Sequence, residues 1–298
     1  MSTLWQLESA AAPAGPGGIS ATAADQAALQ NEALEKAFEA LRTFDWGTGI
    51  TIPPPKKPPE DEDGKPASKK KAPEPNPPED LHVLAPVEEA VVAAHGDAAA
   101  AKALEFRLVA ALGSDAPRAA KDFICRQLRI IGTAESVPAL AALLLDKDLS
   151  HMARYALELN SAPQAAAALR EALPKAQGEL KVGLIGSLGK RRDAASVPLL
   201  APLLADADRP IAAAAAMALG AIGSSDAARA LMACVEKGAG GIKAAAADAC
   251  LVCGERLLEE GKTAEAVALY KSLGGEDQPR HVRLAATRGM LNAAGKRE

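Results

Sequence analysis

The sequence predicts an all-α fold, a right-handed α-solenoid of about six helical hairpins. One observation is a pair of apolar stripes at helical spacing between Asp193 and Gly223, separated by a short polar turn at 206–210. A second is that Ser-Val-Pro occurs at 136–138 and again at 196–198, an offset of 60 residues that corresponds to two units of about 30. Neither helix of such a hairpin buries its stripe alone, so neighbouring hairpins must stack.

Each apolar stripe identifies one helix of the hairpin. The first helix carries Val197, Leu200, Leu203 and Leu204, and the second carries Ile211, Ala215, Ala218, Leu219 and Ile222. Asp208 is placed to cap the second helix, and Pro210 suits its first turn because proline lacks the amide hydrogen that a first turn leaves unused.

The same reading extends along residues 81–298, where glycines mark many of the helix ends. A helix at 87–95 leads into the array. The first helices of the six hairpins are expected at 97–112, 134–146, 163–173, 193–205, 225–237 and 263–273. The second helices are expected at 115–131, 149–159, 179–189, 209–222, 240–260 and 279–294.

These residues resemble HEAT repeats, in particular the short bacterial kind related to the phycobilin-lyase HEAT-like repeats of the ARM-type α-solenoids. The resemblance covers residues 97 to 294, and Pro138 and Pro198 match the proline that such repeats favour in the first helix. It implies stacked hairpins, and it says little about function because such repeats serve many unrelated purposes.

The resemblance also implies an aspartate at the turn within each hairpin and a basic residue one turn into the second helix. Two hairpins keep both members of this pair, namely Asp115 with Lys121 and Asp277 with Arg283. Three other hairpins keep only one member of the pair. Two of them keep the basic residue, Lys181 or Lys243, and the third keeps Asp206 but has Ala212 at the basic position.

Composition favours this architecture. Of the 298 residues, 49% are hydrophobic but only 3% are aromatic, so the core must consist of Leu, Ile, Val and much Ala, which lets helices approach closely. The net charge of −4 provides no general attraction to nucleic acid or to an acidic membrane, and no nucleic-acid partner is expected. Four cysteines in a chain of this length do not indicate a disulfide scaffold.

The amino terminus does not resemble a secretory signal, because it lacks a basic region and Glu8 interrupts its one apolar patch. The longest apolar run, 211–219, is too short to span a bilayer. We therefore expect a soluble, cytoplasmic protein, with export applying only if the start is misassigned. Residues 1–24 are rich in small residues, Gly and Pro, and are expected to be disordered.

An amphipathic helix is expected from Asp25 to Phe44, within a segment that ends at 46, because Leu29, Leu34, Ala37, Phe38 and Leu41 recur at helical spacing. Phe44 and Trp46 are either ligand contacts or anchors of this helix on the solenoid. We favour the anchoring role, since exposed aromatic side chains are costly in so aromatic-poor a chain.

The segment 47–80 is rich in Pro, Lys and Glu and is interpreted as a disordered linker with polyproline II character. Residues 55–58 fit a Pro-x-x-Pro ligand for an aromatic groove, and the lysines at 69–71 are suited to nucleic acid or anionic lipid. Because the acidic cluster at 60–63 offsets these lysines, we favour a solubilising spacer over either binding role.

No motif for catalysis, a cofactor or a metal stands out in the sequence. None of the four histidines is followed by glutamate, as HEAT-repeat di-iron hydroxylases require. Cys250 and Cys253 lack a second pair that would complete a zinc site, so they are expected to fill a buried face. Gly183 to Gly186 lies within a predicted helix and lacks the preceding strand of a nucleotide fingerprint.

Basic residues on the second helices are the candidate site for a partner. The predicted groove consists of Lys121, Arg126, Arg154, Lys181, Lys243 and Arg283. These side chains either tie neighbouring repeats together through aspartates and turn carbonyls, or line a groove that receives an acidic or extended peptide.

The function predicted from these features is a non-enzymatic scaffold that binds an unidentified protein or peptide along the solenoid, without a cofactor. The alternatives are a HEAT-like enzyme, of the bilin-lyase or nucleic-acid glycosylase type, and the amino-terminal piece of a longer repeat array. The last helix lacks an obvious polar cap, so self-association through that helix is also expected.

Overall fold

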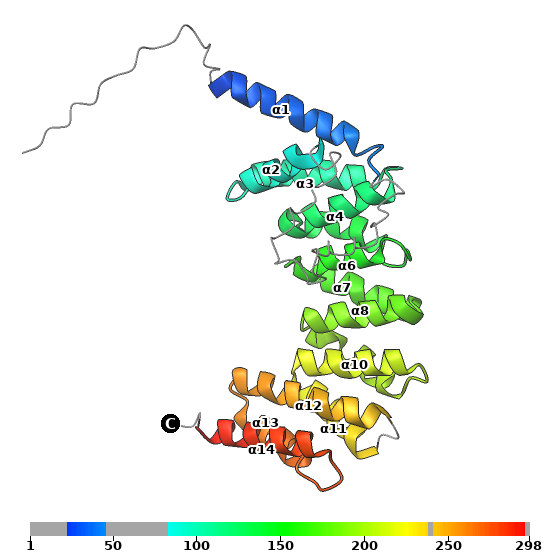
Figure 1. Ribbon diagram of the computed structural model, residues 1–298, viewed down its shortest axis with the longest axis vertical. Helices are drawn as coiled ribbons and strands as arrows, with labels where there is room; N and C mark the ends of the chain where they lie inside the picture. Colours follow the sequence, from blue (N-terminus) through cyan, green and yellow to red (C-terminus); the bar gives the residue numbers. More distant parts are fainter. Residues whose placement is uncertain (1–22, 46–82, 238–240, 296–298) are drawn as a thin grey trace, which may run out of the picture.

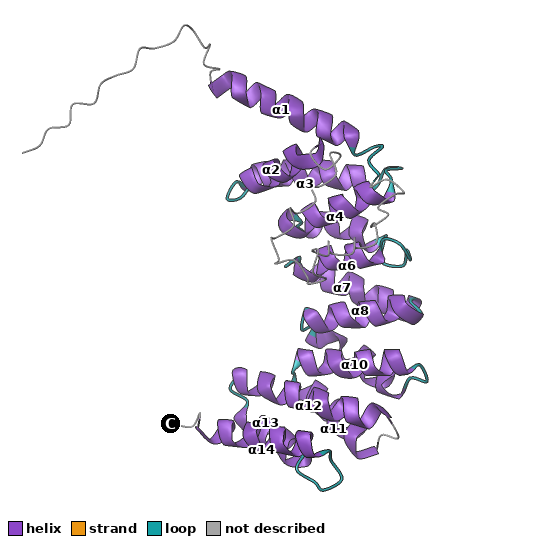
Figure 2. Cartoon of the chain, viewed as in Figure 1, coloured by secondary structure: helices purple, strands orange, loops and turns teal. Residues whose placement is uncertain are grey.

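The computed structural model describes residues 23–45, 83–237 and 241–295, and every regular element within them is a helix (Figures 1 and 2). The α-helices are α1 (Ala23–Ala40), α2 (Ala85–Ala93), α3 (Ala98–Leu112), α4 (Arg118–Ile131), α5 (Val137–Ala141), α6 (Ser150–Leu159), α7 (Pro163–Ala172), α8 (Gly178–Lys190), α9 (Val197–Leu200), α10 (Arg209–Ile222), α11 (Ser225–Lys237), α12 (Gly241–Glu259), α13 (Thr263–Ser272) and α14 (Arg280–Gly295).

After α2, these helices pair as six hairpins stacked along the long axis of the molecule, as Figure 1 shows. The second helices are α4, α6, α8, α10, α12 and α14, and each packs on the next one in the stack. The predicted α-solenoid of about six hairpins is therefore confirmed. Most helices begin and end within three residues of the predicted bounds.

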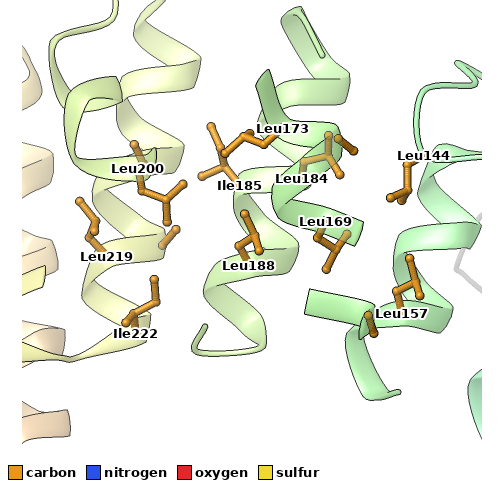
Figure 3. Packing of buried hydrophobic residues seen from close by; sticks show 14 of the residues in the cluster. Leu144, Leu157, Leu169, Leu173, Leu184, Ile185, Leu188, Leu200, Leu219 and Ile222 are labelled. Atoms are coloured by element: carbon orange, nitrogen blue, oxygen red, sulfur yellow. The ribbon is translucent and has the colours of Figure 1, made fainter. Parts of the chain in front are cut away.

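One continuous core runs through the stack, from Ala37 on α1 to Ala293 on α14. Figure 3 shows leucine and isoleucine side chains lying between the helices of successive hairpins, with Leu157, Leu169 and Leu184 among those labelled. Many of the other buried residues are alanines, whose small side chains let adjacent helices approach closely. Burial of this shared surface is the main stabilising contribution, because an isolated hairpin would leave it exposed to water.

The first helices of the second and fourth hairpins differ from the prediction of continuous helices at 134–146 and 193–205. The second hairpin instead has a 3-10 turn, Ala134–Ser136, then the short α5 and a turn at 142–145. The fourth has 3-10 turns at Ala194–Ser196 and Ala201–Ala205 on either side of α9. In the fourth hairpin the reason is Pro202, which has no amide hydrogen to donate to the carbonyl of Pro198, so the chain tightens into 3-10 geometry.

The predicted cap at Asp208 is also wrong in detail. Asp208 is the N-cap residue of α10, but its side chain accepts no capping hydrogen bond. Asp206 orders the turn instead, because its Oδ1 accepts a hydrogen bond from the Asp208 amide at 2.9 Å. In the second hairpin, Asp146 Oδ1 accepts from the amides two and three residues further on, a local turn geometry that aspartate favours. Pro210 lies in the first turn of α10, as predicted.

Helix α1 packs on α2 and also contacts α3 of the first hairpin, at the amino-terminal end of the array. Arg107 of α3 lies 3.9 Å from the centre of the Phe38 ring and donates a hydrogen bond to Glu35 at 2.9 Å. Phe44 is buried, which confirms its predicted role as an anchor. Trp46, residues 1–22 of the expected disordered terminus and the expected linker at 47–80 lie outside the described residues.

Candidate functional site

The structure places all six residues of the predicted basic groove on second helices. Lys121 and Arg126 lie on α4, Arg154 on α6, Lys181 on α8, Lys243 on α12 and Arg283 on α14. The side chains differ in what they contact, so they divide into two groups.

Lys181 and Lys243 contact the next repeat in the stack. Lys181 Nζ lies 3.9 Å from Asp206, and Lys243 Nζ lies 2.9 Å from Asp277. Each lysine therefore contacts an aspartate in the following hairpin, although the turn of its own hairpin lacks one. The hydrogen bond from Lys243 lowers the pKa of Asp277 from its ordinary value. Together with Arg118 and Asp148, 3.8 Å apart, these pairs form what we call the inter-repeat ladder.

Arg154 also joins two repeats, in this case through a backbone carbonyl. Its Nη1 donates to the Gly183 carbonyl on α8 at 3.0 Å and to Ser187 Oγ at 3.3 Å. Burial lowers the pKa of this guanidinium, partly offset by the nearby Glu158 carboxylate. A Cβ atom on residue 183 would lie 2.5 Å from the guanidinium carbon, so a side chain there would displace the Arg154 guanidinium from this carbonyl. The sequence indicates only that Gly183 does not belong to a nucleotide-binding motif. The structure shows that the missing side chain leaves room for the Arg154 guanidinium.

The second group is available at the surface. Arg126 is exposed and pairs with Asp122 on its own helix at 2.9 Å. Lys121 and Arg283 are partly exposed, one turn into α4 and α14. These three cations are therefore not used in the inter-repeat ladder within the described residues.

Further basic residues near these positions stabilise the fold. The Arg191 guanidinium donates to the carbonyls of Leu157 and Asn160, so it satisfies acceptors at the carboxyl end of α6. Burial lowers the pKa of Arg191. Lys190 pairs with Glu158 at 2.7 Å, and Arg129 lies 3.7 Å from the centre of the Tyr155 ring. The sequence places these cations near the groove but does not reveal their partners.

A large open pocket lies between the fourth and fifth hairpins. Its volume is about 930 Å³, and we call it the inter-repeat pocket. Apolar lining comes mostly from alanines together with Pro202, Leu204 and Ile242, and Asp206, Arg209 and Lys237 are the charged residues in its wall. The volume falls within the range of small-molecule and cofactor sites. Sequence reasoning did not identify this pocket.

Large apolar side chains are exposed on the second helices. The residues are Ile130, Leu159, Met217, Val252, Leu284 and Leu291. They lie on α4, α6, α10, α12 and α14, so we call the outward surface of the second helices the second-helix face. Leu284 and Leu291 lie two turns apart on α14 and provide an apolar surface there. The expected self-association through this helix stays a prediction.

Among the described residues, side chains that could bind a metal ion are not grouped together. Within the described part of the chain, no three His, Cys, Asp or Glu side chains are grouped as they would be around a metal ion. His95, His151 and His281 are all exposed. No helix within 23–45, 83–237 or 241–295 combines the length and hydrophobicity needed to cross a membrane.

Three cysteines are buried and one is accessible. Burial raises the pKa of Cys125 and Cys253 from 9.0 to about 12, and it raises that of Cys250 as well. Cys234 is partly exposed and belongs to the wall of the inter-repeat pocket. Cys250 and Cys253 lie in the core, as the sequence predicted.

The buried thiols predict alkaline destabilisation. Below pH 9 they are neutral in both states, whereas between pH 9 and 12 the unfolded thiols ionise and the buried ones do not. The free energy of unfolding should therefore fall in that window, by about 1.4 kcal/mol per pH unit for each buried thiol. Urea unfolding between pH 8 and 11 would measure the slope. Cys125→Ala should make this slope shallower by the contribution of one buried thiol, about 1.4 kcal/mol per pH unit. An unchanged slope in this variant would contradict the prediction.

Comparison with known proteins identifies one matching family, over part of the chain. No curated protein matches the sequence. Among solved structures, a similar chain is an engineered protein studied by the Northeast Structural Genomics Consortium, with 20% identity, coverage of 70% of this chain and 96% of that chain, and a TM-score of 0.36. Residues 166–250 match the family model of HEAT repeats, from within α7 to within α12. Residues 166–250 of this chain are therefore identified as HEAT repeats.

Proposed function

We propose that the chain is a non-enzymatic scaffold that binds a protein or peptide partner along the second-helix face. The observation that supports this proposal is the exposure of large apolar side chains there, with Ile130 67% and Met217 71% exposed. Apolar side chains gathered on one surface are typical of interaction sites. Repeat proteins commonly use such extended surfaces for binding.

These positions are related by the repeat. Lys121 and Ala212 are equivalent because each lies one turn into a second helix, so Arg126 and Met217, five residues later, are equivalent as well. Ile130 lies one turn beyond Arg126 on α4. At this position of the repeat α4 therefore carries a cation and α10 an apolar side chain, so a partner bound along the second helices would contact both kinds.

The two groups of basic residues have different roles in this proposal. Lys121, Arg126 and Arg283 supply positive charge to the second-helix face and favour an acidic partner. Arg154, Lys181 and Lys243 set the position of one repeat relative to the next through their contacts with the neighbouring hairpin. These residues support binding indirectly, by fixing the spacing of the face.

The test is affinity purification from the native host with mass spectrometry. The variant Ile130→Asp/Met217→Asp should lose the partner, with roughly tenfold weaker binding for each substitution. The matched control is Phe106→Asp/Leu199→Asp, which changes exposed apolar residues on the first helices α3 and α9. This control should retain the partner. Equal loss in both variants, or a partner that binds both as well as the unaltered chain, would contradict the proposal.

A further inference from the structure

Among the described residues, the inter-repeat ladder has no ion pair between the second and third hairpins or between the fourth and fifth. Lys181 joins the third hairpin to the fourth, and Lys243 joins the fifth to the sixth. At the equivalent position of the fourth hairpin stands Ala212, which has only a methyl group and cannot reach the next repeat. Ala212 lines the inter-repeat pocket, so the pocket occupies the place where a long basic side chain is missing.

The apolar lining of the pocket includes residues of α10, the helix that also carries the exposed Met217. Ala213 of α10 and Ala230 of α11 belong to its lining, together with Leu204 and Ile242. Met217 lies one turn beyond Ala213 on α10 and is exposed. An aliphatic side chain entering the pocket would therefore belong to a ligand that extends along the face, as a peptide does.

The rim of the pocket is positively charged. Arg209 and Lys237 are exposed, and no described residue forms an ion pair with either of them. The third charged residue, Asp206, is near Lys181, so its negative charge is partly offset. Arg209 also begins α10, whose amino-terminal end carries partial positive charge. Carboxylates are the groups that complement this rim.

We infer that the inter-repeat pocket binds an extended acidic peptide, with an aliphatic side chain in the alanine-lined hollow and flanking Asp or Glu carboxylates on Arg209 and Lys237. The inference rests on the proposed scaffold function and assigns it a specific contact. Charge complementarity selects this occupant, because a neutral apolar peptide would leave both cations unpaired, and a basic peptide would meet them with like charge.

Binding is tested with a fluorescein-labelled peptide, Glu-Asp-Leu-Val-Leu-Asp-Glu, titrated with the full chain. The matched peptide has Gln and Asn in place of Glu and Asp, and it should bind at least about tenfold more weakly. Cys234 reports occupancy, because it lines the pocket while the other three cysteines are buried. Bound acidic peptide should slow its modification by monobromobimane by roughly tenfold, with the modified cysteine identified by peptide mapping.

Two variants test the location. Arg209→Glu should weaken binding about tenfold, whereas Arg280→Glu, which reverses an exposed charge at the first position of α14, should leave binding unchanged. Ala233→Phe places a ring in the pocket from an exposed position on α11 and should abolish binding while circular dichroism stays unchanged.

Three outcomes overturn the inference, namely equal binding of the neutral peptide, peptide binding without protection of Cys234, and no binding of the acidic peptide. The partner-capture experiment is read separately, with Ile130→Asp/Met217→Asp. If the partner is lost from the Ile130→Asp/Met217→Asp variant but still captured by Arg209→Glu, that result would support the scaffold function and show that the pocket takes no part in it.

Discussion

Glu105→Ala is expected to lower the free energy of unfolding by about 3 kcal/mol. Glu105 lies on α3 and is only 1% exposed. Its Oε1 accepts hydrogen bonds from the amides of Thr133 and Ser136, at 2.6 Å and 3.1 Å, and its Oε2 accepts from the Thr133 hydroxyl at 2.9 Å. The carboxylate thus holds the start of the second hairpin against the first. Alanine would leave the buried Ser136 amide without an acceptor and would remove both hydrogen bonds to Thr133.

Urea unfolding followed by circular dichroism measures this effect. Glu105→Gln keeps one acceptor oxygen but presents an amide group to the other donors, so it should fall between alanine and the unaltered chain. The control is Glu135→Ala, an exposed glutamate in the same segment, which should change stability by less than about 0.5 kcal/mol. If Glu105→Ala were as mild as this control, the carboxylate would not hold the two hairpins together.

The fold was predictable because helical periodicity is a local property of the sequence. Apolar residues every three to four positions in 209–222 require a helix that buries one face, and the return of the same pattern requires neighbours of the same kind. The conformation of 201–205 was not predictable in this way. Its apolar residues keep helical spacing, whereas the missing amide hydrogen of Pro202 decides the hydrogen-bond pattern.

The candidate site depends on contacts between repeats, which are distant in sequence. The pattern identifies the basic positions and predicts that they tie neighbouring repeats together, but it does not show which aspartate each one contacts. Lys181 pairs with Asp206 of the next hairpin. The dependence of Arg154 on Gly183 requires the packing of α6 on α8. Ala212 was visible as a departure from the repeat, and only the assembled stack shows that a pocket results.

Gly189→Ala is expected to destabilise the chain by roughly 1 to 3 kcal/mol. Gly189 lies where α8 crosses α10, and a Cβ atom there would be 2.7 Å from the Cα of Ala218. The obstructing atom belongs to the backbone, so no side chain can rotate away and the two helices must separate. Gly220 repeats this contact one hairpin later, where a Cβ would lie 2.8 Å from the Ala249 carbonyl oxygen. These two glycines set the spacing of the second helices.

Gly186→Ala, three residues earlier in the same helix, should have the opposite sign. Gly186 is exposed, and a Cβ there would meet no atom within 4 Å. Alanine should therefore stabilise the chain by about 0.5 to 1 kcal/mol, through its higher helix propensity alone. Urea unfolding of the two variants separates the effects, because the gain in propensity is common to both and only Gly189 meets a neighbouring helix. Stabilisation by both substitutions would mean that α8 and α10 do not approach this closely.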